Sequence, residues 1–180
     1  MTRGSRGAAE MRLRPEAESD LAFLRSLYRS SREREMDRLA DWSDEQKQTF
    51  LDGQFAAQRA YYREHYPDAD FDIIERAGCP IGRLYVASTP RQLILMDITL
   101  LAAERNSGLG HRLVRELQAR ALREQKIVSL HVEDDNPARR LYDRLGFGEV
   151  AAVTFYKLMH WVPEGLEALS EVLAAEVRAR

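Results

Sequence analysis

The sequence predicts an α+β fold, and three consecutive stretches carry the prediction. An almost unbroken apolar run covers 93–101, apolar residues at helical spacing cover 109–122, and a β-rich alternating segment covers 127–132. Apolar runs bounded by turn residues are typical of buried strands, and apolar residues three to four apart are typical of one helix face. A buried strand, a helix and a second strand therefore lie at the centre of the chain.

Composition and charge limit the class of protein. The chain has 180 residues, of which 44% are hydrophobic and 31% charged, as expected for one globular domain. Its net charge of −2 gives no reason to expect nucleic acid as a partner. The single cysteine, Cys79, excludes an internal disulfide and a cysteine-based zinc cluster. No run is long enough for a membrane span and 1–10 lacks a signal-peptide core, so we expect a cytoplasmic protein with a disordered tail over 1–10.

The N-terminal part predicts a strand followed by two helices. Met11–Pro15 alternates weakly and suits an edge strand, and Glu18–Tyr28 has leucines at helical spacing. Ser43 and Gln46 form the pattern of a capping box, which predicts a helix from there to His65. We interpret the aromatic residues of this helix as core packing. Its apolar and aromatic residues are Phe50, Leu51, Phe55, Ala56, Tyr62 and Tyr66.

A hairpin is predicted before the central strand, and two strands and a helix after it. Phe71–Arg76 and Ile81–Ala87 flank the turn 77–80, and strand-like runs cover 149–153 and 154–161. A C-terminal helix is expected from Pro163, with apolar residues on one face: Leu166, Leu169, Val172, Leu173 and Val177. Whether this helix caps the sheet or forms a dimer contact is left open.

The turn between the central strand and its helix has the composition of an anion site. It reads Arg105-Asn-Ser-Gly108-Leu-Gly110. The first turn of a helix presents unpaired N–H groups and a positive dipole end, and glycines let a phosphate approach the backbone. Neither a Walker loop nor a dinucleotide fingerprint is present, since the latter needs glycine where Leu113 lies. A pyrophosphate site and an ordinary strand-to-helix turn both remain open at this point.

A second block follows the strand 127–132. Asn136 suits the N-cap of a helix, Pro137 its first position, and Gly146 the stop of a helix over Ala138–Leu145. Together with the Arg105 loop, the phrase N-P-A-R-R-L-Y-D-R-L-G-F resembles the signature blocks of the GCN5-related N-acetyltransferases (GNAT). The clear resemblance covers Leu93–Phe147.

The resemblance implies a single domain over 11–162, with 163–180 as a C-terminal helical extension. The sheet would be mixed and mostly antiparallel, with about six to seven strands flanked by helices. The implied reaction is acetyl transfer from acetyl-CoA to a primary amine of a small molecule, peptide or protein by direct attack, without a metal. The implied residues for acetyl-CoA are these: Ile98 and Leu100 through their backbone, Arg105, Asn106, Ser107, Gly108, Leu109, Gly110 and Asn136.

The resemblance also implies catalytic roles. Tyr142 matches the tyrosine taken as the general acid, or at least the hydrogen-bond partner, of the departing thiolate. His131 resembles the base of some protein N-terminal acetyltransferases, and its ordinary pKa near 6.5 suits that role. Those relatives pair the histidine with a tyrosine where this chain has Ile94, so Glu133 and water remain alternative bases. Asp97 is interpreted as structural.

Other features leave the acceptor and the activity open. The proline common before the family's loop is Ala102 here, and Asn106 replaces a glycine. Glu33 and Glu35 lie on a helix end that borders the acceptor in the family, but the favoured interpretation is a solvated helix end with ion pairs. The alternative function is a catalytically silent acetyl-CoA sensor or interaction module. The expected partners are acetyl-CoA and an unidentified amine, and a homodimer is left open.

Overall fold

The computed structural model describes residues 11–153 and 156–179. The tail expected over 1–10 and the start of the strand expected from Thr154 lie outside this description. The strands are β1 (Met11–Pro15), β2 (Asp70–Arg76), β3 (Cys79–Ser88), β4 (Gln92–Leu100), β5 (Ile127–Glu133), β6 (Gly148–Val153) and β7 (Tyr156–Trp161). The helices are η1 (Glu18–Asp20), α1 (Leu21–Ser31), α2 (Glu33–Met36), α3 (Asp44–His65), η2 (Ala102–Glu104), α4 (Leu109–Glu124), α5 (Arg139–Arg144) and α6 (Glu167–Arg178).

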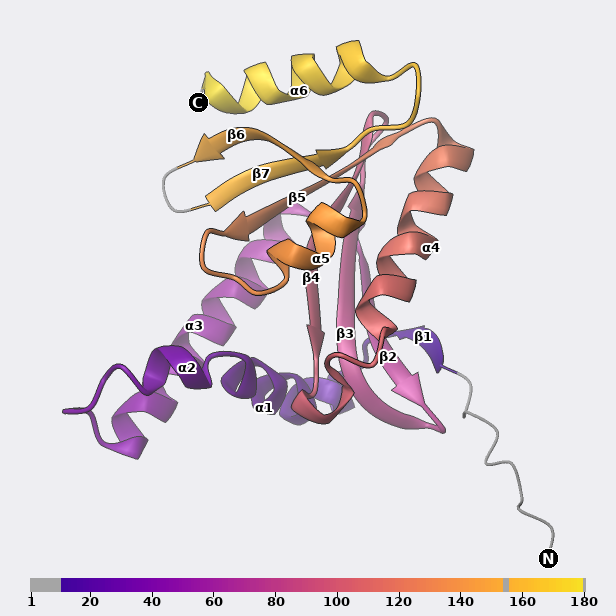
Figure 1. Cartoon of the computed structure of the whole chain (residues 1–180). Coiled ribbons are helices and arrows are strands. Elements are labelled where there is room, and N and C mark those ends of the chain that lie inside the picture. The colour runs from indigo at the N-terminus through magenta and orange to yellow at the C-terminus, as the bar shows by residue number, and fades with distance from the viewer. Residues whose placement is uncertain (1–10, 154–155, 180) are drawn as a thin grey trace, which may run out of the picture. The chain divides into compact units, whose positions relative to one another are not determined.

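These strands form a seven-stranded sheet in the order β1-β2-β3-β4-β5-β7-β6 (Figure 1). The β4–β5 pair is parallel, whereas the β1–β2, β5–β7 and β6–β7 pairs are antiparallel. The predicted mixed, mostly antiparallel α+β fold is therefore confirmed. The chain divides into two compact units. The first extends to Leu84 and includes Ile98–Glu104, and the second comprises Tyr85–Asp97 and the chain from Arg105 onward.

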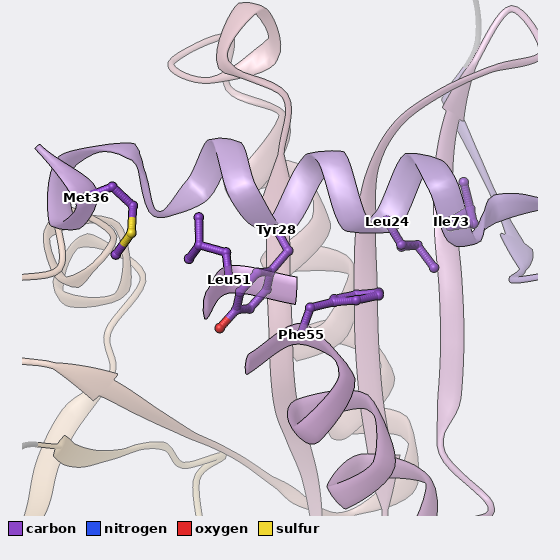
Figure 2. Packing of buried hydrophobic residues seen from close by; sticks show 6 residues of the cluster. All are labelled: Leu24, Tyr28, Met36, Leu51, Phe55 and Ile73. Atoms are coloured by element: carbon purple, nitrogen blue, oxygen red, sulfur yellow. The ribbon is translucent and has the colours of Figure 1, made fainter. Parts of the chain in front are cut away.

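The core of the first unit lies where α1, α2 and α3 meet β2 (Figure 2). Its buried members are Leu24, Tyr28, Met36, Leu51, Phe55 and Ile73. The α3 helix begins as predicted, because the Ser43 hydroxyl accepts from the Gln46 N–H and the Gln46 side chain accepts from the Ser43 N–H. The interpretation as core packing was wrong for Phe50, which is exposed, whereas Leu51 and Phe55 are buried.

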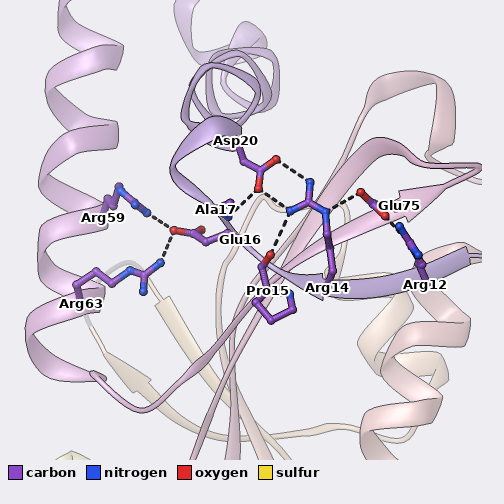
Figure 3. A network of polar contacts seen from close by, with 9 residues as sticks. All are labelled: Arg12, Arg14, Pro15, Glu16, Ala17, Asp20, Arg59, Arg63 and Glu75. Atoms are coloured by element: carbon purple, nitrogen blue, oxygen red, sulfur yellow. Dashed lines mark hydrogen bonds and ion pairs between the residues drawn. The ribbon is translucent and has the colours of Figure 1, made fainter.

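Arginines hold the buried acids of the first unit (Figure 3). Both Arg14 Nη atoms donate to the Asp20 carboxylate, at 2.6 and 2.7 Å, and Arg14 Nε donates to Glu75 at 2.6 Å. Arg12 donates to the other Glu75 oxygen at 2.7 Å. These hydrogen bonds lower the pKa of the Asp20 and Glu75 carboxyls below their ordinary values. Charge-assisted contacts thus join β1, η1 and β2.

Close backbone contact and left-handed residues shape the β-hairpin of the first unit. Ala77 and Gly78 connect β2 to β3 with φ of 52° and 76°, so the turn is shorter than the expected 77–80 and β3 begins at Cys79. Two left-handed residues match the twist of a tight hairpin. A Cβ on Gly82 would lie 2.4 Å from the Thr99 carbonyl oxygen, so only glycine allows this approach of β3 to β4.

In the second unit, α4 packs on β5 with one apolar face. Its buried residues are Leu109, Leu113, Val114, Leu117, Gln118 and Ala121. The predicted face was wrong at Leu122, which is 51% exposed. Gln118 takes a buried position instead, because its amide donates to the Leu145 carbonyl at 2.8 Å and so links α4 to the end of α5.

The α5 helix is shorter than predicted. It begins at Arg139 rather than Ala138, and Asn136 caps the preceding turn by accepting from the Ala138 N–H at 2.9 Å. Gly146 ends the helix with φ of 80°, as its position after the last helical residues predicted.

The C-terminal helix α6 lies beside β6 (Figure 1). It begins at Glu167 rather than Pro163, because Gly165 has φ of 87°, which interrupts helical geometry. Ser170, Leu173 and Ala174 form its buried face, whereas the predicted Val172 is exposed. In the part of the chain described, no helix combines the length and apolar character needed to cross a membrane.

Candidate active site

The loop from Arg105 to Gly110 leads into α4 through two left-handed residues. Asn106 has φ of 59° and Gly108 has φ of 83°. Asparagine tolerates this region better than most residues, which explains how Asn106 can replace a glycine. No atom lies within 4 Å of a Cβ built on Gly108, so the space beside this backbone is open. Gly110 is in the helix, and a Cβ there would meet Leu141 at 3.4 Å.

The start of α4 has the electrostatic character of an anion site. Gly108 is the N-cap and provides no side-chain cap. The first N–H groups of a helix have no intrahelical acceptor, and the helix dipole adds partial positive charge there. The sixteen-residue α4 has no acidic residue in its first turn that would offset this charge. Arg105 and Ser107 are exposed in the same loop, whereas Leu109 is buried and anchors it.

The strands β4 and β5 pair only at their N-terminal ends. Gln92–Leu95 pairs with Ile127–Leu130, and the pairing between the two strands ends there. Beyond this point β5 continues to pair with β7, from Val128 to Glu133. In the second unit, Met96 and Asp97 are therefore the residues of β4 directly after the segment that pairs with β5. His131 is the residue of β5 directly after the segment that pairs with β4.

Tyr142 is buried on α5, with 6% of its surface exposed and its ring 5.6 Å from that of Phe147. Its hydroxyl forms no hydrogen bond with any residue that the structure describes. Burial raises the pKa of Tyr142, and the negative charge of Asp97 raises it further. Asp97, which we interpreted as structural, is thus an electrostatic neighbour of the candidate acid. Alternation along β4 alone did not reveal this pairing with a distant helix.

His131 lies on β5 and faces the side of the sheet that α6 covers. It pairs with Leu158 of β7, and Ser129 pairs with His160. Opposite residues of an antiparallel pair share a face. His160 is buried and lies 2.8 Å, Nδ1 to Oγ, from Ser170 of α6. His131 and His160 therefore project from the same face, and Ile94 pairs with Ser129 rather than with His131.

Desolvation lowers the pKa of both histidines. The pKa of His160 falls to about 4, first because of burial and then because of the charge of His131. Burial by the surrounding protein also lowers the pKa of His131, although its side chain remains exposed to solvent. Both imidazoles are therefore neutral at neutral pH, and the exposed one can accept a proton. Spacing in the sequence gave His160 no role. The signal that relates it to His131 is the pairing of β5 with β7, which places both side chains on one face of the sheet.

The other predicted residues are distributed between the units. Asn136 and Glu133 lie in the second unit, at the exposed turn before α5 and at the partly buried end of β5. Ile98 and Leu100 lie in the first unit, on β4, and both are partly buried. Glu33 and Glu35 are exposed on α2 of the first unit, and Glu35 is paired with Arg32 at 2.7 Å. No group of three or more metal-ligand side chains occurs among the described residues.

The model of the Acetyltransferase (GNAT) family matches residues 22–147. No curated protein matches the sequence. Many solved structures match the fold.

Three of these structures illustrate the likeness. The PaiA N-acetyltransferase of Thermoplasma acidophilum, solved with coenzyme A, is 15% identical with a TM-score of 0.66, and the match covers 86% of this chain and 99% of that one. A GCN5-related N-acetyltransferase of Rhodopseudomonas palustris is 17% identical with a TM-score of 0.61, covering 89% and 100%. The putative acetyltransferase YncA of Salmonella typhimurium, solved with acetyl-CoA, is 20% identical with a TM-score of 0.52, covering 86% and 94%.

Proposed function

Because the family model matches more than half of its length, this chain belongs to the GNAT acetyltransferase family, and we propose that it transfers an acetyl group from acetyl-CoA to a primary amine. The observation that carries the proposal is the open, uncapped N-terminus of α4 beside Gly108. Its N–H groups and Arg105 would bind the pyrophosphate of acetyl-CoA. The fold neighbours from Thermoplasma acidophilum and Salmonella typhimurium that contain coenzyme A and acetyl-CoA support this choice of ligand.

The proposed reaction is direct attack of a neutral amine on the thioester carbonyl. A C–N bond forms and the C–S bond breaks, the amine loses a proton, and the departing sulfur gains one. Tyr142 would give its hydroxyl proton, or a hydrogen bond, to this sulfur. Its raised pKa keeps the hydroxyl protonated, and no described residue forms a hydrogen bond with it. The backbone of Ile98 and Leu100 would hold the pantetheine arm.

Proton removal from the amine is assigned to His131, directly or through water. Its lowered pKa leaves the imidazole neutral at neutral pH, which is the form that accepts a proton. The competing proton acceptors are Glu133, two residues after His131 on β5, and water alone. The value of kcat/KM should rise with pH through the pKa of His131 and then level off. His131→Ala should remove this inflection, whereas Glu133→Gln should keep it. An unchanged profile in His131→Ala would exclude His131 as the base.

The test of the function is an acceptor screen with purified protein and acetyl-CoA, following free thiol. Amine-dependent thiol release supports transfer. Calorimetric binding of acetyl-CoA without release for any amine supports the silent sensor instead. Arg105→Ala should weaken acetyl-CoA binding by about 1.5–3 kcal/mol, the scale of a charge-assisted hydrogen bond.

A further inference from the structure

Two large aromatic side chains lie exposed together at the start of α3 in the first unit. Trp42 and Phe50 are each 39% exposed, and their rings meet edge to face with centroids 5.4 Å apart. Isolated exposed apolar residues are ordinary, but a paired Trp and Phe beside a cavity is a feature of binding sites. The aromatic pair therefore needs an explanation other than core packing.

A cavity of about 470 Å³ lies beside this pair. It is lined by Trp42, Glu45, Gln46, Thr49 and Phe50. The last four residues recur at helical spacing, so they lie on one side of the first turns of α3. The cavity lies entirely in the first unit.

The walls of the cavity are held in place by the local backbone. The Trp42 N–H donates to the Leu39 carbonyl at 3.2 Å, and Leu39 packs against the core cluster of α1 and α3. On the next residues, the reciprocal hydrogen bonds of Ser43 and Gln46 fix the first turn of α3. Trp42 is thus anchored on both sides.

The charge around the cavity favours a cation. Asp41, Asp44 and Glu45 occur within 41–46, which contains no lysine or arginine, and Lys47 does not line the cavity. The Glu45 carboxylate forms no hydrogen bond or ion pair with any described residue. An anion is disfavoured despite the helix start, because Ser43 already caps it and two acids occupy its first turn. Aromatic faces also attract ammonium groups.

We propose that this cavity binds the ammonium end of an organic amine. Trp42 and Phe50 would contact the ammonium and its alkyl chain through their rings, while Glu45 would supply the opposite charge. If the ligand is the acceptor of acetyl transfer, which rests on the proposed function, the acceptors are aliphatic amines that are cationic when they bind.

Trp42 itself reports on binding. The chain has two tryptophans, so Trp161→Phe leaves Trp42 as the only one. Titrating this variant with pentane-1,5-diamine, without acetyl-CoA, should change Trp42 emission, and the uncharged pentane-1,5-diol should bind about fivefold more weakly. If Trp161→Phe does not fold, calorimetry on the native chain makes the same comparison.

Charge and ring variants complete the test. Glu45→Gln should weaken diamine binding about threefold, whereas Glu64→Gln, which removes an exposed acid near the other end of α3, should leave it unchanged. Phe50→Leu should weaken diamine binding more than Glu45→Gln does. Equal binding of diamine and diol, or equal effects of Glu45→Gln and Glu64→Gln, would overturn the site. Diamine binding without amine-dependent thiol release would keep the site and reject the proposed transfer, and the reverse result would keep the transfer and reject the site.

Discussion

In the first unit the buried carboxylates of Asp20 and Glu75 are bound by arginines, whereas in the second unit the buried side chains of Tyr142 and His160 are uncharged at neutral pH. These two pairs of buried polar groups are thus accommodated in opposite ways. Arginine pairing lowers a carboxyl pKa and keeps the group charged, while desolvation favours the neutral form of Tyr and His. Paired ions hold elements in register, and neutral desolvated groups remain able to exchange a proton, so perturbed groups of the second kind mark candidate chemistry.

The largest effect is expected at Tyr142, a neutral buried group that we expect to serve the reaction rather than the stability of the fold. Tyr142→Phe should lower turnover by roughly 100-fold or more, the low end for general acid catalysis. Acetyl-CoA binding should change little, because the ring still packs on Phe147. Steady-state thiol release and calorimetry measure the two quantities. Full turnover with a lower melting temperature would assign Tyr142 to the core instead.

The arginines of the first unit should affect stability and not the reaction. Arg14→Ala leaves the buried Asp20 without its bidentate partner and should lower Tm by about 5 °C or more. Arg12→Ala is the matched control, since this side chain is 68% exposed and binds the same Glu75. Its Tm should fall by about 2 °C or less. Equal falls in the two variants would contradict the distinction between buried and exposed pairs.

Changes in Tm with pH should occur in different pH windows for the two units. The ordinary pKa of His160 is 6.5 and its folded value is about 4, so between these values only the unfolded chain takes up the proton. Stability due to His160 is therefore full above pH 6.5 and falls as the pH drops toward 4. Asp20 has a pKa below its ordinary 3.8, so its contribution is full above 3.8 and is lost as the pH falls further.

Two variants separate these windows. His160→Gln should reduce the loss of Tm between pH 6.5 and 4, and Asp20→Asn should reduce the loss below pH 3.8. Thermal unfolding followed by circular dichroism across this range measures both. The same slope above pH 4 in His160→Gln and in the native chain would show that His160 is not desolvated.

Local sequence signals predicted most element boundaries because their causes lie within a few residues. The capping box of Ser43 and Gln46, the strand Met11–Pro15 and the stop at Gly146 all needed only neighbouring residues. Burial at Leu122 was mispredicted because the exposed side of an amphipathic helix depends on which partner covers it. Phe50 and Val172 were mispredicted for the same reason.

The polar environment of the candidate site could not be predicted, because it joins segments distant in sequence. Arg105 and Gly108 follow from a contiguous motif, and Tyr142 from a second one. The pairing of Asp97 with Tyr142, and of His160 with Ser170, arises only when β4, α5, β7 and α6 pack in the second unit. No spacing within a single element carries that information.

The attachment of α6 has a consequence for local opening of the second unit. The helix is held by the buried Ser170–His160 hydrogen bond, the exposed Arg91–Glu176 pair and one bond from Arg178 to the Val150 carbonyl. Exposed pairs add little, so Ser170, Leu173 and Ala174 provide most of the attachment. Amide protons of α6 should therefore exchange with deuterium together, through detachment of the helix, at a lower opening free energy than those of β5.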